Sequence, residues 1–411
     1  MMKNEKVVLF LLASLNFTHI LDFMIMMPLG NYLMPFFNIN PQQFSFLVSA
    51  YTFSAAITGF AAAFYVDRFD RKKVLLFGYI GFLVGTIACG IAPNYHLLLV
   101  ARIFAGLFGG LIGAQVLSII SDMFSYENRG KAIGAVMSAF AIASTFGVPF
   151  ALYLANLISW HAPFILVGIL GIVLVPFLIK FIPSMTHHLE KRDEKKSFFQ
   201  ALHIVQSDSK LSLALLFSGL MMMGHFLIIP FINPYMEFNN GYTKQQTPMI
   251  YLVGGIASFF AANWLGRISD KYGKLNVFTI CILCSLPLVI GVTHIPRVSY
   301  WIVLSLFGVW FVSSTGRSIA AQAMVSNVVP PLHRGSFMSF NSSVQQLGTS
   351  IASVVAGFLI LKGADGKILH YKWLGYLSVV VLLCCFLLGR YLFGKMDKEI
   401  VIEKQVDNKE E

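Results

Sequence analysis

Three charged or titratable side chains lie inside long apolar segments, where they could carry a proton or bind an ion. Asp22 lies 16 residues after Lys6, about 24 Å along a helix. Arg102 lies six residues into another apolar segment, and His225 lies fourteen residues into a third, about 21 Å along. Since neighbouring spans run in opposite directions, we expect the three to share one depth. A charge in the bilayer core is costly, so each is a candidate functional residue.

Asp22 is the candidate proton carrier, with Arg102 as its cation. A carboxylate binds a proton more readily when buried and less readily beside a cation. A site that alternates between these surroundings could take up a proton on one side and release it on the other. The alternative is a static Asp22–Arg102 salt bridge. His19, three residues before Asp22 on the same helix face, could relay protons or only form a hydrogen bond.

Arg317 lies about ten residues from one end of its segment, without a carboxylate in the apolar segments of its own half. We expect it either to contact an anionic group of a substrate or to pair with backbone carbonyl groups. Nearby amides could bind hydroxyl and carboxylate groups or only join helices. With Arg317 and His225, the candidate substrate residues are Gln115, Gln322, Asn341 and Gln345, and Gln346 adds a further amide.

The elements that must hold these side chains are membrane helices. Hydrophobic residues make up 57% of the chain and charged residues 12%, with a mean hydropathy of +0.73, whereas soluble domains carry roughly 25% charged residues. A spanning helix needs about 20 apolar residues. We do not expect membrane-spanning β-strands, because these runs are long and do not alternate. The twelve predicted spans are 7–31, 43–66, 74–92, 96–121, 131–157, 161–182, 211–236, 247–268, 275–293, 298–327, 335–361 and 373–394.

The distribution of basic residues predicts the orientation. Of the 30 Lys and Arg residues, 23 fall in segments on the side of the N-terminus, five in loops on the other side and two within helices. Basic residues concentrate on the cytoplasmic side of membrane proteins. We therefore expect both termini in the cytoplasm and the chain in the plasma (inner) membrane. The same bias accounts for the net charge of +11 without nucleic acid as a partner.

No pattern in the chain predicts a cofactor or a metal. The five cysteines all fall inside predicted helices and form no disulfide framework. Cys281 and Cys284 form one Cys-x-x-Cys without the second pair that a zinc site needs. The nucleotide-binding pattern Gly-x-x-x-x-Gly-Lys-Ser/Thr is absent, so we do not expect this chain to be driven directly by ATP.

A basic loop occurs twice, once in each half of the chain. Residues 63–73 recur as residues 266–274, so that Asp67 and Asp270 lie 203 positions apart. A duplicated loop among duplicated helices is typical of a transporter built from two like halves. The predicted organisation is a bundle over residues 1–182, a cytoplasmic linker over 183–210, a second bundle over 211–394 and a charged, disordered tail over 395–411.

These repeated residues resemble the major facilitator superfamily over roughly residues 7–394. Its loop between helices 2 and 3 reads Gly-x-Leu-x-Asp-Arg-x-Gly-Arg-Arg/Lys. The first copy matches this pattern at Asp67, Arg68, Arg71 and Lys72 and departs from it at Ala63, Tyr65 and Asp70. The second copy, through Gly266, Asp270 and Gly273, is closer to the pattern.

The resemblance implies a network of charges that holds the cytoplasmic side shut and breaks on opening. Within it, Asp122 is placed to meet Arg71. The alternative is that these charges only set the topology. The candidate gate residues are Asp67, Arg68, Arg71, Asp122, Arg129, Asp270, Lys271 and Arg334.

A segment of the fifth predicted helix resembles a motif of the superfamily's antiporters. Residues 143–149 end in Gly147, Val148 and Pro149, where the motif has Gly and Pro adjacent. This variant is similar to the sugar-efflux and drug:proton antiporter branch. The alternative is a close-packed, kinked helix without a coupling role.

The resemblance implies twelve helices in two pseudo-symmetric six-helix bundles, with helices 1, 4, 7 and 10 around a central cavity. It implies a monomeric secondary transporter that works by alternating access, with a small-molecule substrate and protons as partners. We expect proton-coupled export of a small organic solute such as a drug or sugar. The alternatives are proton-coupled uptake of an anionic metabolite, a non-transporting sensor, and a membrane enzyme, for which the chain offers no cluster of catalytic side chains.

Overall fold

Helices account for almost all of the structure. The computed structural model describes residues 3–65, 68–124, 126–186, 208–328 and 334–410. Within these residues, eleven helices are long and apolar enough to cross a membrane. One further helix, α16 (Arg334–Leu359), is as long but carries Asn, Gln and Ser side chains along its length. A helix pairs every backbone polar group within one segment, as lipid requires. The predicted all-helical membrane fold is confirmed.

The first half of the chain contains one π-helix and eight α-helices within the described residues. Asp70 and Asn94 cap two of these helices by accepting hydrogen bonds from the backbone N–H groups of Lys72 and Leu97. The elements are α1 (Lys3–Met26), α2 (Gly30–Phe37), α3 (Pro41–Tyr65), α4 (Arg71–Gly90), α5 (Tyr95–Met123), α6 (Tyr126–Ile142), the π-helix η2 (Ala143–Gly147), α7 (Val148–Leu157) and α8 (His161–Phe181).

The second half repeats this pattern and adds a small hairpin. Its two strands pair antiparallel, with Leu361 opposite Leu369. The elements are α11 (Ser209–Phe226), the 3₁₀ turn η3 (Ile229–Phe231), α12 (Ile232–Phe238), α13 (Thr247–Tyr272), α14 (Lys274–His294), α15 (Tyr300–Asn327), α16, β1 (Leu361–Lys362), β2 (Ile368–Leu369) and α17 (Tyr371–Glu410).

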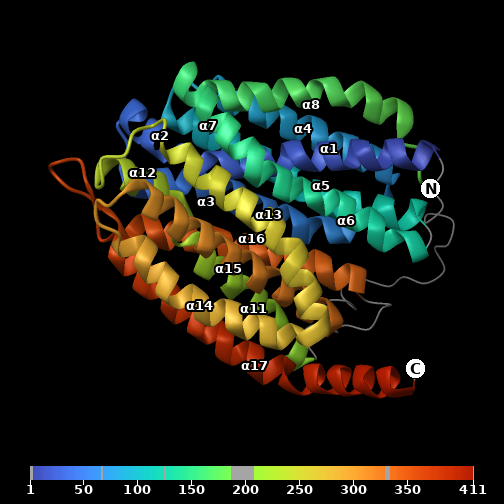
Figure 1. The fold of residues 1–411 in the computed structure, drawn as a ribbon. Coiled ribbons are helices and arrows are strands. Elements are labelled where there is room, and N and C mark those ends of the chain that lie inside the picture. The colour runs from blue at the N-terminus through green and yellow to red at the C-terminus, as the bar shows by residue number, and fades with distance from the viewer. Residues whose placement is uncertain (1–2, 66–67, 125, 187–207, 329–333, 411) are drawn as a thin grey trace.

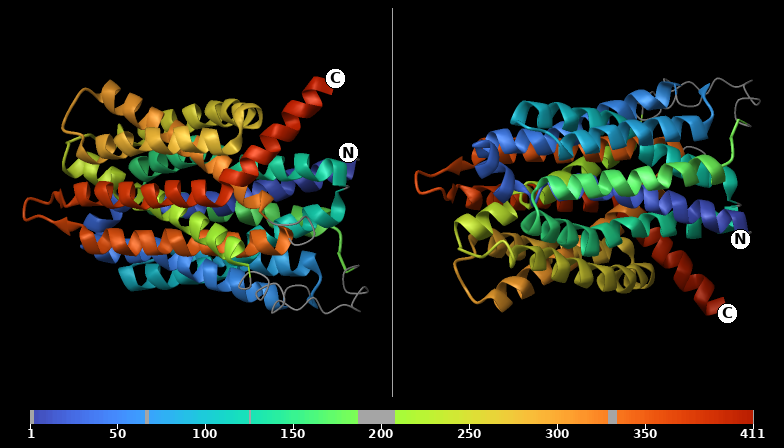
Figure 2. Two further views of the ribbon diagram at one scale, coloured as in Figure 1. Left: turned by 90° about the horizontal axis from the view of Figure 1, so that it is seen from below. Right: turned by 90° about the horizontal axis from the view of Figure 1, so that it is seen from above.

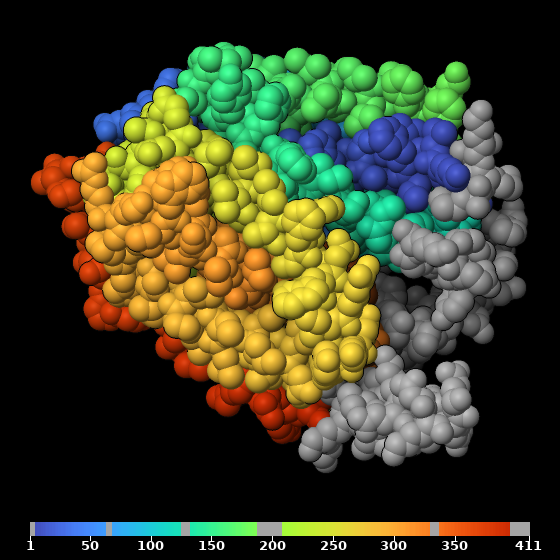
Figure 3. All heavy atoms as spheres, viewed as in Figure 1, coloured from blue at the N-terminus to red at the C-terminus, as the bar shows by residue number. Residues whose placement is uncertain are grey.

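The long helices run side by side along one common direction (Figure 1, Figure 2). Both termini lie at one end, here called the terminal end, and the β1–β2 hairpin lies with α2 and α12 at the other, the hairpin end. Toward the terminal end the outer helices α8 and α17 diverge (Figure 1), whereas α3 and α16 stay in contact there, with the ring centroids of Phe60 and Phe340 5.9 Å apart. In the space-filling view, α13, α14 and α15 cover much of the second half (Figure 3).

Two expected continuous helices are broken near the hairpin end. The first predicted span, 7–31, is divided between α1 and α2, and the seventh, 211–236, between α11, η3 and α12. Pro28 and Pro230 lie at these breaks. A proline removes one backbone donor and its ring displaces the preceding turn, so the helix ends before it.

The charged tail, for which the sequence predicts disorder, follows on from the last membrane helix. The last helix, α17, continues to Glu410 (Figure 1). Residues 396–410 contain neither Gly nor Pro and are rich in Lys and Glu, which are strong helix formers. The helix therefore extends past the apolar part of its sequence.

Glycines in α5 allow the backbones of α5 and α3 to approach each other closely. A Cβ atom on Gly106 would overlap the carbonyl oxygen of Tyr51, and one on Gly110 would overlap that of Ala55. Small residues drive helix association in lipid because they allow such close approach. This contact fixes the helix that carries Arg102 against α3.

Candidate functional site

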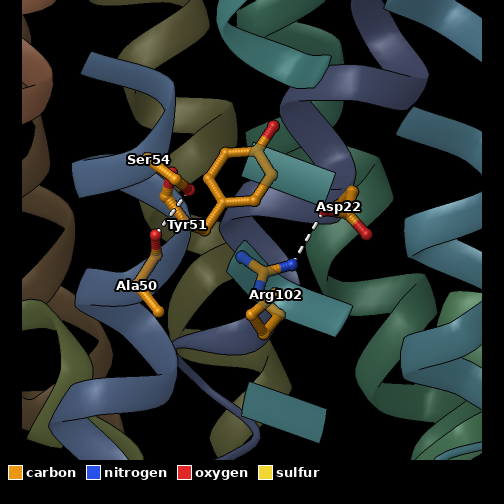
Figure 4. A network of polar contacts seen from close by, with 5 residues as sticks. All are labelled: Asp22, Ala50, Tyr51, Ser54 and Arg102. Atoms are coloured by element: carbon orange, nitrogen blue, oxygen red, sulfur yellow. Dashed lines mark hydrogen bonds and ion pairs between the residues drawn. The ribbon is translucent and has the colours of Figure 1, made fainter. Parts of the chain in front are cut away.

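Asp22 of α1 and Arg102 of α5 form an ion pair inside the first half. Arg102 Nη1 donates a hydrogen bond of 2.8 Å to Asp22 Oδ2, and both side chains are fully buried. Figure 4 shows the two side chains pointing toward each other from neighbouring helices. The depth argument from the sequence placed both residues in one layer, and here they are in direct contact.

The pair leaves much of its hydrogen-bonding capacity unused. Asp22 Oδ1, Arg102 Nε and Arg102 Nη2 are buried and have no hydrogen-bond partner among the described residues. Thr86 of α4 lies beside the carboxylate. One oxygen of the carboxylate is therefore engaged and the other can accept a proton or a donor.

Aromatic rings surround the pair. The ring of Tyr51 lies 4.4 Å from Arg102 Cζ, a cation–π contact from α3 (Figure 4). His19 lies 5.4 Å from the ring of Phe82, measured between centroids. Both nitrogens of His19 are buried without a hydrogen-bond partner among the described residues. Since no such bond links His19 to Asp22, the relay role stays a prediction.

A second cationic centre lies in the other half. Arg317 of α15 is 1% exposed, and its Nη2 lies 3.3 Å from Nδ1 of His225 on α11. Ser314 Oγ lies 3.0 Å from the same nitrogen. Within the described residues, no carboxylate forms an ion pair with Arg317. The structure thus separates the three expected layer residues: Asp22 and Arg102 form one centre, and His225 joins Arg317 in the other.

A series of contacts between aromatic rings connects the two centres. Phe23, next to Asp22, lies 5.9 Å from Tyr51 and 5.8 Å from Phe226 of the second half, measured between ring centroids. Phe226 in turn is the neighbour of His225 and lies 5.4 Å from its ring. The residues beside the two charged centres are therefore in contact across the boundary between the halves.

The amides predicted for a substrate cavity do not form one group. Gln345 Nε2 of α16 donates to Gln322 Oε1 of α15 at 3.2 Å. Gln115 and Asn341 are buried, and the side-chain oxygen of each has no hydrogen-bond partner among the described residues. Their roles stay predictions.

Among the predicted gate residues, Arg71 and Asp122 are in contact. Arg71 Nε at the start of α4 lies 2.6 Å from Asp122 Oδ2 near the end of α5. Both belong to the first half, so this ion pair alone does not join the two halves. Arg68, Asp270 and Lys271 are exposed. Asp67 lies outside the described residues, as do the side chains of Arg129 and Arg334.

Asp70, where the chain departs from the superfamily's loop pattern, has a structural role. Its carboxylate accepts hydrogen bonds from the backbone N–H of Lys72 at 3.0 Å, Ser184 Oγ at 2.6 Å and the backbone N–H of Met185 at 2.9 Å. Burial alone would raise the pKa of Asp70, but these bonds and Lys73 outweigh it and lower that pKa. The carboxylate ties the start of α4 to the segment after α8.

The motif around Gly147 and Pro149 spans the π-helix η2, which ends at Gly147, and the start of α7. The π-helix packs against α13, where a Cβ on Gly255 would lie 2.5 Å from Cα of Thr145. On its other side, a Cβ on Gly147 would lie 2.7 Å from Leu21, the neighbour of Asp22. π-Bulges are frequent at functional sites. This segment therefore touches both the second half and the helix that carries Asp22.

Sequence reasoning missed the polar contacts at the hairpin end. Asn31 Nδ2 of α2 and Thr247 Oγ1 of α13 both donate to Glu237 Oε1 of α12, at 2.5 Å and 3.0 Å. Asn233 Nδ2 donates to the carbonyl oxygen of Pro28 at 2.9 Å. The bonds from Asn31 and Asn233 join the two halves. The only available signal was an acidic residue at the end of an apolar segment.

The comparisons with known proteins agree on one family. The model named Major Facilitator Superfamily matches residues 12–320 and 310–410. The chain belongs to the major facilitator superfamily. It is 24% identical over 351 residues to the uncharacterized MFS-type transporter YceJ of Bacillus subtilis (strain 168), a match that covers 85% of this chain and 88% of that protein. The superfamily assignment identifies this chain as a multi-pass membrane transporter.

Two further comparisons cover different extents of this major facilitator protein. Multidrug resistance protein 3 of Bacillus subtilis (strain 168) is 33% identical over 153 residues, 37% of this chain and 29% of that protein. The fold is similar to that of a bacterial homologue of the human lysosomal transporter Spinster, in an inward-facing and unoccupied conformation. That likeness has a TM-score of 0.73 at 16% identity and covers 96% of this chain and 98% of the other.

Proposed function

We propose that this superfamily member is a proton-coupled antiporter that exports a small organic solute, such as a drug or sugar, by alternating access. It is proposed to act as a monomer in the plasma (inner) membrane. Both termini, and with them the terminal end, are assigned to the cytoplasm. The positive-inside distribution of Lys and Arg supports this orientation.

The single observation that carries the proposal is that only one of the two carboxylate oxygens of Asp22 is hydrogen-bonded among the described residues. A fully buried acid is costly unless it is paired and hydrogen-bonded or serves a function. Asp22 has one oxygen bonded to Arg102 and the other without a partner among the described residues. Such a carboxylate can gain and lose a proton without rebuilding a large hydrogen-bond network.

The proposed cycle uses two states of this pair. With Asp22 ionised, the bond to Arg102 draws α1 and α5 together. A proton on Asp22 removes its negative charge and weakens that bond. The groups that face the carboxylate, Arg102, Tyr51 and Cys89, come from α5, α3 and α4. Protonation can therefore alter how α1 packs against three neighbouring helices of the first half.

The contacts between the halves suit an inward-facing conformation. Hydrogen bonds between the halves join Asn31 to Glu237 and Asn233 to Pro28 at the hairpin end. A further one joins Ser350 of α16 to the carbonyl oxygen of Ser49 of α3, still in the part of the bundle nearer that end. In the proposed orientation, this end faces outward. The Arg71–Asp122 ion pair lies at the opposite end, where the gate is proposed to close.

Two features support export as the direction. The antiporter-like motif at Gly147 and Pro149 covers η2 and the start of α7, and η2 packs against the other half. A relative named Multidrug resistance protein 3 matches 37% of the chain. A specific observation favours a second candidate, proton-coupled uptake of an anionic metabolite, because Arg317 lacks an acidic partner among the described residues.

Proton flux into liposomes that contain the purified protein tests the proposal. An imposed pH gradient is combined with a panel of sugars, cationic drugs and organic acids. Proton movement triggered by one class, opposite in direction to that solute, supports antiport. Proton movement in the same direction as an organic acid selects the uptake candidate. Solute transport that is independent of the pH gradient contradicts proton coupling.

A further inference from the structure

The surroundings of Arg317 contain more donors than acceptors. Arg317 Nε, Arg317 Nη1 and Trp310 Nε1 are all buried and have no hydrogen-bond partner among the described residues. Trp310 is 0% exposed and Arg317 is 1% exposed. Each of these three nitrogens can only donate. Buried polar groups are normally hydrogen-bonded, so three unused donors in one region need an acceptor.

His225 adds a fourth donor to the same region. Arg317 can only donate, so His225 Nδ1, 3.3 Å from Arg317 Nη2, must accept that bond. With Nδ1 as the acceptor, a neutral imidazole carries its proton on Nε2. Ser314 Oγ also reaches Nδ1, at 3.0 Å. The ring therefore presents an N–H and adds no negative charge to balance Arg317.

The donors lie on adjoining surfaces. Trp310 and Arg317 are seven residues apart on α15, so they share one face of that helix. Long side chains on a helix point toward its N-terminus, which directs Arg317 toward Trp310. The ring of His225 lies 5.3 Å from the ring of Trp310 and within bonding distance of Arg317. It thus spans the space between them.

The two arginine centres differ by one charge. Arg102 is paired with Asp22 at 2.8 Å, so the centre of the first half is neutral overall. Arg317 has no such partner in the described part of the chain, and the centre of the second half carries one positive charge. An uncompensated buried charge is strongly unfavourable. An anion bound at Arg317 would remove this penalty and use the free donors.

We infer that Arg317, His225 and Trp310 form a binding site for an anionic group, a carboxylate or a phosphate, on the transported solute. The guanidinium fork suits either group because it offers parallel N–H donors. The aromatic rings of Phe226 and Phe311, which lie 5.4 Å from His225 and 5.1 Å from Trp310, suit an apolar body attached to that group. The inference rests on the proposed transport function and specifies the class of its substrate.

Binding of matched probes to the purified full-length protein tests the site without any gradient. Benzoate is compared with neutral benzamide, and phenyl phosphate with neutral phenol, by isothermal titration calorimetry and by the shift of the unfolding midpoint. We expect at least one anion to bind about tenfold or more tightly than its neutral partner, as one charge-assisted hydrogen bond provides. If benzoate binds more tightly than phenyl phosphate, the site is specific for a carboxylate; if phenyl phosphate binds more tightly, it is specific for a phosphate. If neither anion binds more tightly than its neutral partner, the inference is overturned.

Three variants locate the binding to this site. Arg317→Gln should weaken binding of the preferred anion about tenfold or more, while Arg297→Gln, a change in an exposed loop, should leave it unchanged. Arg317→Lys keeps the charge and controls for folding; it should bind with intermediate affinity because the fork is lost. Equal anion binding in wild type and Arg317→Lys, together with unchanged binding in Arg317→Gln, overturns the inference.

The two proposals fail in different ways. Asp22→Asn removes the proposed proton carrier but keeps Arg317, His225 and Trp310, so the preferred anion should still bind this variant more tightly than its neutral partner does. Anion binding in a protein without proton-coupled transport would contradict only the coupling. Proton-coupled transport of a neutral or cationic solute that Arg317→Gln leaves unchanged would contradict only the anion site.

Discussion

Asp22 and Arg102 are joined by a single hydrogen bond of 2.8 Å, although both side chains are fully buried. A guanidinium and a carboxylate can form two parallel bonds, and here one oxygen and two nitrogens of the pair have no partner among the described residues. Buried ion pairs contribute little net stability unless their hydrogen bonds are complete. The pair is therefore better explained by a functional role than by stabilisation of the fold.

The rings between the two charged centres suggest how one half can sense the other. Tyr51 touches Arg102, Phe23 touches Tyr51 and Phe226, and Phe226 touches His225. A change in the position of Asp22 moves its neighbour Phe23 against the second half. Proton binding in one half and solute binding in the other would be coupled through this aromatic contact.

Replacing Gly110 by Ala should disrupt the packing of α5 on α3. A Cβ at Gly110 overlaps the carbonyl oxygen of Ala55, whereas one at Gly113, a turn later, meets nothing within 4 Å. Forced backbone shifts cost about 1–3 kcal/mol. We expect Gly110→Ala to lower the unfolding midpoint clearly and Gly113→Ala to keep or raise it, measured by thermal unfolding in detergent. Equal midpoints for the two variants would disprove this close approach.

Removing the side chain of Glu237 should weaken the contact between the halves at the hairpin end. Asn31 and Thr247 both donate to Oε1 of this carboxylate, and leaving a buried donor unsatisfied costs about 1–3 kcal/mol. Glu237→Ala should therefore destabilise the protein and favour opening at this end.

Glu237→Gln is the matched control. Its carbonyl oxygen can take the place of Oε1 and accept both bonds, so the unfolding midpoint should fall less than in Glu237→Ala. Thermal unfolding reports stability, and hydrogen exchange of the backbone amides of α2 and α12 reports access. A Gln variant that is as destabilised and as accessible as the Ala variant argues against the hydrogen bonds as the cause.

The pKa of Asp70 predicts how its contribution to stability changes with pH. Because the folded-state pKa is lowered below the usual 3.8, ionised Asp70 stabilises the fold at all pH values above the pKa of the unfolded chain. This contribution is lost as pH falls below 3.8 and through the lower, folded-state pKa. The difference in unfolding midpoint between wild type and Asp70→Asn should be constant from pH 7 to pH 5 and shrink below pH 4. If the difference in unfolding midpoint grows on acidification, the folded-state pKa of Asp70 is raised and not lowered.

The sequence predicted the helices and the contact at Asp22 well, for a physical reason. Apolar length determines each span, and the rise of 1.5 Å per residue converts position into depth. This arithmetic placed Asp22 and Arg102 at one height, and the structure joins them. It also placed His225 at that height. The side chain of His225 contacts Arg317, while its neighbour Phe226 contacts Phe23, the neighbour of Asp22.

Rotation about the helix axes could not be predicted in the same way. Depth alone did not show that the side chain of His225 contacts Arg317. It also did not show that Trp310 and Arg317 lie on the same face of α15. The break near Pro28 was also missed, because a proline can kink a helix without ending it. Asn31 and Glu237 meet across 206 positions, and only the packing of the halves brings them together.

The most direct test of the account is uphill transport by Asp22→Asn in liposomes with an imposed pH gradient. Wild type should accumulate or expel its solute against a concentration gradient, as should Asp365→Asn, a control in the exposed hairpin loop. We predict that Asp22→Asn loses this uphill transport and its proton flux but still exchanges labelled for unlabelled solute, which needs no proton. Uphill transport retained in Asp22→Asn would contradict the assignment of Asp22 as the proton carrier.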